Sequence, residues 1–411
     1  MDITSKTFLA ILKAALSSKE PDLDREITPE QWQQIFRLAG IHKVLPLFYE
    51  AVYSLSGMQK EQALLAAVRH QVKQQVVVQS LRTADFLELN SRLQEAQVQP
   101  LVVKGIICRN LYPMPDHRPS GDEDVLIPAD RFAMAHQVLT DFGMETEESG
   151  FDAYEVPYRK AGSPLYLELH RSLFPPASGA YGDMNRFFEK VFDRAVPVDI
   201  RGRTVYTLDY TDHLFYLICH ALKHFLHSGF GIRQVCDIVL FANAYGERVD
   251  WLQLLENCRA IHGEKFAAAL FRIGSEYLIF DPDLAAYPDI WRKIPVDIHP
   301  MLEDLLAGGL YGDASLSRKH SSHITLDAVE ARKQGREAKG AVAASLFPPA
   351  ANLEGRYPYL KDHPYLLPAA WCSRIWEYAR NRGSNRGGNT SEALKIGRER
   401  IELMKLYGIL E

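Results

Sequence analysis

The sequence predicts an α+β protein, in which a small mixed β-sheet is flanked by N- and C-terminal helical segments. Residues 61–96 contain neither Gly nor Pro, which favours one long helix. From Val98 the apolar pattern changes to short β-branched runs, and after Thr211 it returns to helical spacing. We therefore expect an N-terminal helical segment (1–96), an α/β core (97–210) and a C-terminal helical domain (211–411).

The individual elements follow from local patterns. A helix is expected at 4–16, where apolar residues recur at helical spacing, and another after Thr28, a capping residue followed by Pro29. In the core we expect strands near Val98 and at 124–127, 151–158 and 164–170, a helix over 128–143 that ends at Gly143, and a hairpin over 198–210. Helices are expected over 211–228, 232–246, 251–263 and 264–278.

Composition limits the classes of function. The chain has 411 residues with 47 basic and 52 acidic side chains, a formal charge of -5. This balance disfavours a protein that coats nucleic acid, so a small or localised ligand is expected. Five scattered cysteines without a C-x-x-C pair indicate reduced core residues. The first apolar stretch is interrupted by Lys13 and resembles an amphipathic helix, and no run is long enough for a membrane span, so we expect a cytoplasmic protein.

The strongest chemical signal surrounds two aspartates. Lys104-Gly105 ends a strand, and Gly121 precedes Asp122 and Asp124 at the start of another. Residues two apart on a strand share a face, so the two carboxylates point together and repel one another unless a cation lies between them. Mg²⁺ is the expected cation, because it takes one or two carboxylates and leaves positions for substrate phosphates. A solvated turn is the alternative interpretation.

A third carboxylate lies where a neighbouring strand can present it. In PLYLELH the leucines face one way, and Tyr166, Glu168 and His170 face the other. A polar stripe of this kind is costly when buried without partners. Beside a metal site, the same stripe would supply a third carboxylate.

These motifs resemble the nucleotidyltransferase superfamily with a polymerase-β-like core, and within it a family of uncharacterised bacterial nucleotidyltransferases. The matching features are Lys104-Gly105, the block from Arg118 to Asp124 with its following apolar residues, and Glu168-Leu169-His170. The superfamily commonly has Gly-Ser where this chain has Lys104-Gly105, and commonly Asp at the position of Glu168.

The resemblance implies transfer of a nucleotidyl group from a nucleoside triphosphate to an unknown acceptor, a small molecule or a protein, with Mg²⁺ or Mn²⁺ as cofactor. Asp122, Asp124 and Glu168 would be the catalytic residues and the metal ligands. The expected phosphate-binding residues are Lys104, Gly105, Arg118 and Gly121. The expected substrate-side residues are His170, His220, His224, Arg233 and Asp237.

Several of these residues have alternative interpretations. Arg118 would bind a phosphate or pair with Asp116 or Asp122. Arg233 and Asp237 are spaced i, i+4 and would otherwise form a helix-surface ion pair.

Four histidines of the 211–228 helix fall on one stripe, namely His213, His220, His224 and His227. They would line the substrate cleft, pack in the core or bind zinc, although H-A-L-K-H lacks the glutamate of H-E-x-x-H. The cleft is expected between this helix and the strand starts at 121–124. Imidazoles with a pKa near 6.5 would make acceptor binding sensitive to mild acid.

Two other functions compete with transfer. The first is a catalytically inactive nucleotide-sensing or protein-binding module on the same fold, of the toxin–antitoxin kind, and the second is a zinc hydrolase. For the enzyme we expect that Asp124→Ala leaves the fold intact and raises the melting temperature by relieving repulsion with Asp122.

Overall fold

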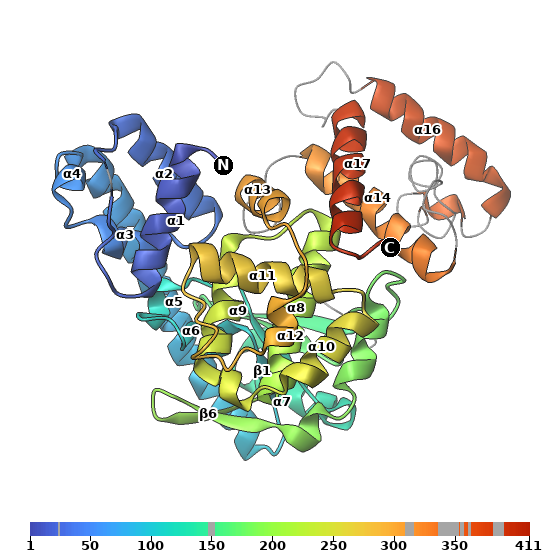
Figure 1. The fold of residues 1–411 in the computed structure, drawn as a ribbon. Helices are drawn as coiled ribbons and strands as arrows, with labels where there is room; N and C mark the ends of the chain where they lie inside the picture. Colours follow the sequence, from blue (N-terminus) through green and yellow to red (C-terminus); the bar gives the residue numbers. More distant parts are fainter. Residues whose placement is uncertain are drawn as a thin grey trace.

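The computed structural model (Figure 1) describes residues 1–23, 25–146, 153–308, 316–335, 353, 357–360, 363–380 and 390–411. Four helices open the chain: α1 (Ile3–Leu16), α2 (Pro29–Ile41), α3 (Leu45–Val52) and α4 (Ser56–Gln59). Thr28 caps α2 as expected, because its hydroxyl accepts from Gln31 N while the Gln31 side chain accepts from Thr28 N.

The long helix predicted for 61–96 is present as α5 (Gln62–Glu95). It supports the loops that lead into the sheet. Gln79 Oε1 accepts from Ser120 N at 2.8 Å, and Arg82 Nε donates to the Pro164 carbonyl at 3.0 Å. α5 therefore holds the segments that precede both strands of the predicted carboxylate site.

The predicted mixed sheet has five strands in the order β1-β2-β5-β4-β3. The bounds are β1 (Leu101–Val103), β2 (Glu123–Leu126), β3 (Met144–Glu145), β4 (Glu155–Lys160) and β5 (Tyr166–His170). β2 and β5 are parallel, and the other neighbours are antiparallel. The two-residue β3 was not predicted, because so short a strand has no detectable period. Residues 151–152 of the predicted strand 151–158 lie outside the described residues.

The remaining elements of the core are α6 (Gly105–Arg109), α7 (Phe132–Asp141) and the predicted hairpin, formed by β6 (Val196–Ile200) and β7 (Arg203–Thr207). β1, β2 and β5 are almost entirely apolar on the side that packs into the interior, and Val102, Val125 and Leu167 are fully buried. The polar residues Asp124, Glu168 and His170 therefore lie on the opposite face of β2 and β5.

The C-terminal half is helical, as predicted. Its helices are α8 (Tyr210–His227), α9 (Ile232–Tyr245), α10 (Trp251–Ala260), α11 (Glu264–Tyr277), α12 (Asp289–Arg292), α13 (His299–Gly308), α14 (Leu316–Lys333), α16 (Leu367–Arg380) and α17 (Thr390–Leu406). Asp209 caps α8 by accepting from Thr211 N and Asp212 N, both at 2.9 Å. Helices α8 and α9 are buried along most of their length.

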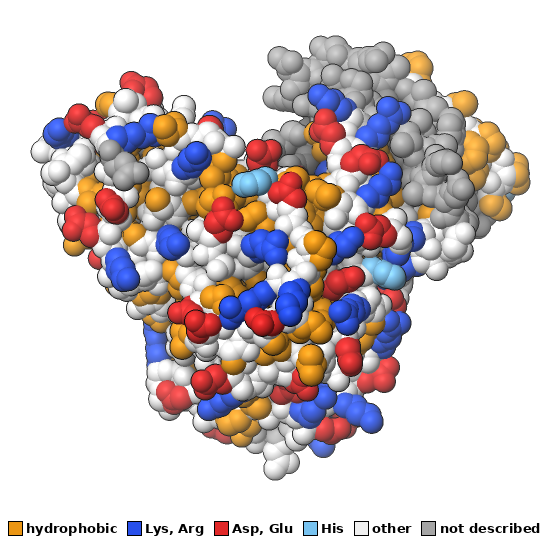
Figure 2. All heavy atoms as spheres, viewed as in Figure 1, with side chains coloured by type: hydrophobic (Ala, Val, Ile, Leu, Met, Phe, Trp, Pro, Cys, Tyr) orange, Lys and Arg blue, Asp and Glu red, His pale blue; other side chains and the backbone are white. Residues whose placement is uncertain are grey.

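Figure 1 shows helices α1–α4 and helices α14, α16 and α17 at opposite upper corners, with the sheet and helices α8–α12 below them. One hydrophobic cluster runs from Phe8 in α1 through the sheet to Ile409. On the face shown in Figure 2, acidic and basic side chains are interspersed, in keeping with the nearly balanced charge of the chain.

Two further expectations concern the cysteines and membranes. Four cysteines are buried free thiols, but Cys372 is exposed, so the expectation of a core residue was wrong at this position. Among the described residues, its helix α16 contributes to a small apolar cluster with Leu353 and Leu360. Among the helices that the structure describes, none combines the length and the apolar character that crossing a bilayer requires.

Gly105 occupies a position that only glycine fits. Its φ is +26°, and a Cβ built on it would overlap Glu123 Oε2. Glu123 cannot move away easily, since it is fully buried, pairs with Arg109 at 2.7 Å and accepts from Ile106 N at 2.9 Å. We expect Gly105→Ala to lower the free energy of unfolding by roughly 2–4 kcal/mol, combining backbone strain with overpacking.

Urea denaturation checks this expectation, and Gly57→Ala is the matched control. Gly57 lies in α4, and a Cβ there meets nothing within 4 Å, so alanine should be neutral or slightly stabilising. Equal stabilities of the two variants would contradict the role assigned to Gly105.

Candidate active site

A cavity of about 220 Å³ lies between the sheet and helices α8 and α9, where the sequence predicts a cleft. The sheet side and its loops contribute Lys104, Gly105, Arg118, Ser120, Asp122, Asp124, Glu155, Glu168 and His170. The helices contribute Tyr216, Leu217, His220, Lys223, His224, Arg233, Gln234 and Asp237. Nearly all predicted site residues therefore line one cavity. Gly121 is the exception, because it is exposed and does not line the cavity, whereas its neighbours Ser120 and Asp122 do.

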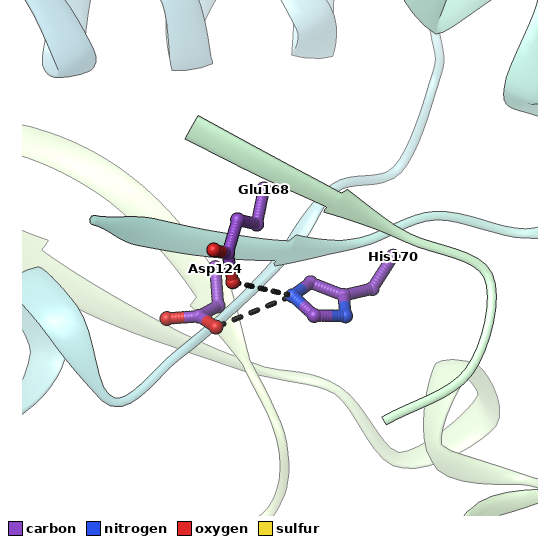
Figure 3. Close-up of side chains that lie close together, drawn as sticks. All are labelled: Asp124, Glu168 and His170. Atoms are coloured by element: carbon purple, nitrogen blue, oxygen red, sulfur yellow. Dashed lines mark hydrogen bonds and ion pairs between the residues drawn. The ribbon is translucent and has the colours of Figure 1, made fainter. Parts of the chain in front are cut away.

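Asp124, Glu168 and His170 form a close group (Figure 3). The parallel pairing of β2 with β5 sets Asp124 opposite Glu168, and His170 follows two residues later on the same face. His170 Nε2 lies 3.2 Å from Asp124 Oδ1 and 3.7 Å from Glu168 Oε2. Although burial lowers the pKa of His170, its hydrogen bonds to these two carboxylates raise it to about 9.

This group has the composition of a divalent-cation site. One ligand atom from each of Asp124, Glu168 and His170 lies within 4.8 Å of the others. The predicted ligand set contained Asp122 instead of His170, and His170 was expected on the acceptor side. Asp122 does line the same cavity, but it is not part of the close group. A ligand role for Asp122 stays a prediction.

Lys104 is the counter-ion of Asp124. Its ammonium nitrogen lies 2.9 Å from Asp124 Oδ2 and 3.3 Å from His220 Nε2. Burial lowers the pKa of Lys104, but Asp124, together with Asp122 and Tyr216, more than offsets this and raises it well above its usual range. Conversely, burial raises the pKa of Asp124, while Lys104 and His170 bring it down to about 2. Lys104 was predicted to bind a phosphate, and here it neutralises a carboxylate.

Arg118 and Asp237 form a buried pair that the sequence did not predict. Arg118 Nε donates to Asp237 Oδ1 at 2.7 Å, and Nη2 donates to Oδ2 at 2.5 Å. The Tyr112 hydroxyl also donates to Oδ1, at 2.8 Å. A carboxylate buried at this depth needs such a bidentate partner, and Arg118 supplies it across 119 residues of sequence.

Three alternatives are thereby corrected. Arg118 pairs with neither Asp116 nor Asp122, because its partner is Asp237; Asp116 pairs with Arg201 at 2.8 Å. Arg233 does not pair with Asp237, and its guanidinium donates to the Pro119 carbonyl instead.

The histidine stripe of α8 divides into three environments. His213 is fully buried, His220 and His224 line the cavity with their Nε2 atoms 3.2 Å apart, and His227 lies 2.8 Å from the Tyr181 hydroxyl. Among the described residues, none of these four imidazoles belongs to a group of three or more potential metal ligands.

The imidazoles on α8 are also less basic than expected. Burial lowers the pKa of His213 and of His224 to about 3, and it lowers that of His220 well below its usual range. The expectation that these histidines make acceptor binding sensitive to mild acid was therefore wrong. Their neutral form persists through the physiological range because burial penalises the charged imidazolium, completely at His213 and in large part at the half-buried His220 and His224.

His213 instead makes protein stability depend on pH. Its Nε2 accepts from Lys104 N at 3.2 Å, and its Nδ1 lies 3.0 Å from Thr207 Oγ1. The folded-state pKa of about 3 is below the ordinary 6.5, so the unfolded chain binds this proton first and stability is lost as pH falls from 6.5 toward 3. We expect His213→Gln to be less stable than the natural protein at pH 7 but to lose less stability between pH 7 and 5. Thermal unfolding at both pH values checks this, and equal losses would contradict it.

Sequence reasoning missed seven cavity residues: Ser120, Glu155, Leu173, Tyr216, Leu217, Lys223 and Gln234. Tyr216 and Lys223 were detectable, because they share the helix face of His220 at spacings of four and three residues. Glu155 was not detectable, since its place depends on the antiparallel register that sets it opposite His170.

Solved structures and family models give the following similarities. An antigenic nucleotidyltransferase-like protein from Paracoccidioides brasiliensis is 17% identical with a TM-score of 0.28, covering 50% of this chain and 95% of that one. JHP933 from Helicobacter pylori is 13% identical with a TM-score of 0.27, covering 62% and 92%. These scores are too low to contribute to an assignment, and no curated protein matches the chain. The family model described as uncharacterised nucleotidyltransferase matches residues 28–278, which include every residue of the cavity, and the chain belongs to this family.

Proposed function

We propose that the protein transfers a nucleotidyl group from a nucleoside triphosphate to an acceptor hydroxyl or similar group, using Mg²⁺ or Mn²⁺ bound by Asp124 and Glu168. The observation that carries the proposal is the β2–β5 register, which sets these two carboxylates side by side at the wall of a cavity. Membership of a nucleotidyltransferase family supplies the class of reaction.

The donor set fits a divalent cation. Carboxylate oxygens are the ligands that Mg²⁺ takes most often, and the imidazole of His170 beside them also suits Mn²⁺ once the bound cation has replaced its proton. When bound there, the cation would supply Lewis-acid activation of the acceptor and neutralisation of phosphate charge. Asp122, on the same cavity wall, is the further carboxylate available to it.

The chain's own groups support the remaining steps. The acceptor oxygen forms a bond to the α-phosphorus, the bond from this phosphorus to the bridging oxygen breaks, and pyrophosphate leaves. Glu168 is the best-placed base for the acceptor proton, because its side chain is 23% exposed whereas that of Asp124 is 3% exposed and paired with Lys104. His220 and His224 remain neutral and can hydrogen-bond an acceptor without adding charge.

The test is an incubation of the purified protein with cell extract, Mg²⁺ or Mn²⁺, and each nucleoside triphosphate labelled at either the α- or the γ-phosphorus. We expect α-label to become attached to an acceptor and γ-label to appear only in pyrophosphate. Asp124→Asn is the inactive control. Transfer of γ-label would contradict the proposal, and retention of nucleotide without transfer of either label would support an inactive nucleotide-sensing module.

A further inference from the structure

The cations that line the cavity fall into two groups. Lys104 and Arg118 are each held by a carboxylate of the protein, Asp124 and Asp237 respectively. Lys223 and Arg233 line the same cavity from α8 and α9, and within the part of the chain that the structure describes neither forms an ion pair. The cations that remain available to a ligand therefore lie on the helical wall, the side of the cavity formed by α8 and α9.

Arg233 is a buried donor that lacks a full set of acceptors. Its residue is 8% exposed, and its guanidinium donates to the Pro119 carbonyl. Its Nε has no hydrogen-bond partner among the described residues. A buried donor left unpaired destabilises the folded protein, so an acceptor from a ligand would recover this free energy.

Lys223 is a half-buried ammonium on the same wall. Its Nζ lies 6.0 Å from the centroid of the Tyr181 ring, a distance at which a cation–π contact is weak. Burial, followed by the charge of Lys104, lowers the pKa of Lys223, because these effects outweigh the opposing charges of Glu155, Asp124 and Glu168. An anion bound beside Lys223 would stabilise its charged form.

We infer that Lys223 and Arg233 form an anion subsite that binds the terminal phosphates of the nucleoside triphosphate. The inference deepens the proposed function and rests on it for the identity of the nucleotide. From the sequence, Lys104 and Arg118 were expected to bind the phosphates, and the helical wall was expected to bind the acceptor.

The dimensions of the cavity favour phosphates as its occupant. Its volume of about 220 Å³ is below the roughly 300–1,000 Å³ typical of sites that enclose a whole small molecule. A phosphate chain can extend from Asp124 and Glu168 on the sheet to Lys223 and Arg233 on the helices, leaving the nucleoside at the mouth. This arrangement brings negative charge to the two cations that have no carboxylate.

Calorimetric titration with inorganic tripolyphosphate, without divalent cations, tests the subsite separately from catalysis. We expect Lys223→Met to weaken binding about tenfold or more, since an ammonium–phosphate contact is a charge-assisted bond. Lys293→Met, which removes an exposed lysine outside the cavity, should bind tripolyphosphate as the natural protein does. Arg233→Lys should weaken binding as well while retaining the charge, because lysine cannot reproduce a planar fork of donors. Melting temperatures establish that each variant is folded.

Three outcomes would overturn the inference. The first is that Lys223→Met and Arg233→Lys are folded and bind tripolyphosphate as the natural protein does. The second is that Lys104→Met alone loses tripolyphosphate binding. The third is that a non-hydrolysable triphosphate analogue fails to displace tripolyphosphate, which would assign the subsite to a phosphate of the acceptor. Binding that depends on Lys223, combined with no transfer of labelled nucleotide, would leave the subsite standing while the proposed function fails.

Discussion

Replacing Asp124 with Ala is expected to abolish nucleotidyl transfer and also to lower the melting temperature. Transfer is lost because Asp124 is the most buried carboxylate of the cation-binding group. Stability falls because the substitution leaves the ammonium of Lys104 and the imidazole of His170 without their shared partner. Removing one member of a buried ion pair costs roughly 3–5 kcal/mol.

The expected fall in melting temperature is the opposite of what the sequence alone predicts. From the sequence, Asp124→Ala would relieve repulsion between the Asp122 and Asp124 carboxylates and raise the melting temperature. The structure places Lys104 against Asp124 at 2.9 Å, and attraction to this cation determines the sign of the change.

A double-mutant cycle separates the two effects of Asp124. Lys104→Met, Asp124→Asn and the double variant are compared by urea denaturation at pH 7. We expect the double variant to be more stable than the sum of the two single losses predicts, because no unpaired charge remains in the site. It should still be inactive. Additive losses would show that Lys104 and Asp124 do not interact in solution, and an active Asp124→Asn variant would remove Asp124 from the mechanism.

The fold was predictable where patterns are long or local. The helix α5 follows from 36 residues (61–96) without Gly or Pro, and the cap of α2 follows from Thr28 and Pro29. The shared face of Glu168 and His170 follows from the two-residue period of a strand. The two-residue β3 was missed, because a helical or strand period cannot be recognised over so few positions.

The candidate site was predictable in its residues but not in its pairings. Periodicity identifies which side chains share a face, but it does not show which carboxylate a given cation will contact. Arg118 was assigned to a phosphate or a local aspartate, yet its partner is Asp237, on a helix 119 residues later in the chain. The burial of His220 and His224, which removes their sensitivity to mild acid, likewise depends on how α8 packs against the rest of the molecule.

Lys104→Met is expected to increase the affinity for Mn²⁺ in the absence of nucleotide. The Lys104 ammonium lies 2.9 Å from Asp124 Oδ2, while Oδ1 faces His170, so a divalent cation bound by Asp124 would share this carboxylate with the ammonium and be repelled by its charge. Methionine keeps most of the side chain's length and removes the charge. Each 1.4 kcal/mol of binding free energy corresponds to a tenfold change in the dissociation constant. Because the repulsion between the ammonium and Mn²⁺ is removed, we expect the affinity to increase about tenfold or more.

Electron paramagnetic resonance of free Mn²⁺ measures this affinity directly and does not depend on activity. Lys223→Met is the matched control, because Lys223 lines the same cavity but forms no ion pair with the described carboxylates, so its removal should change Mn²⁺ affinity far less. Unchanged or weaker Mn²⁺ binding by Lys104→Met would show that the ammonium does not compete for the site. If the affinity rises as expected, the Lys104 ammonium and the divalent cation compete for the negative charge of Asp124. An incoming triphosphate would then offset the excess positive charge, so that cation and nucleotide would favour each other's binding.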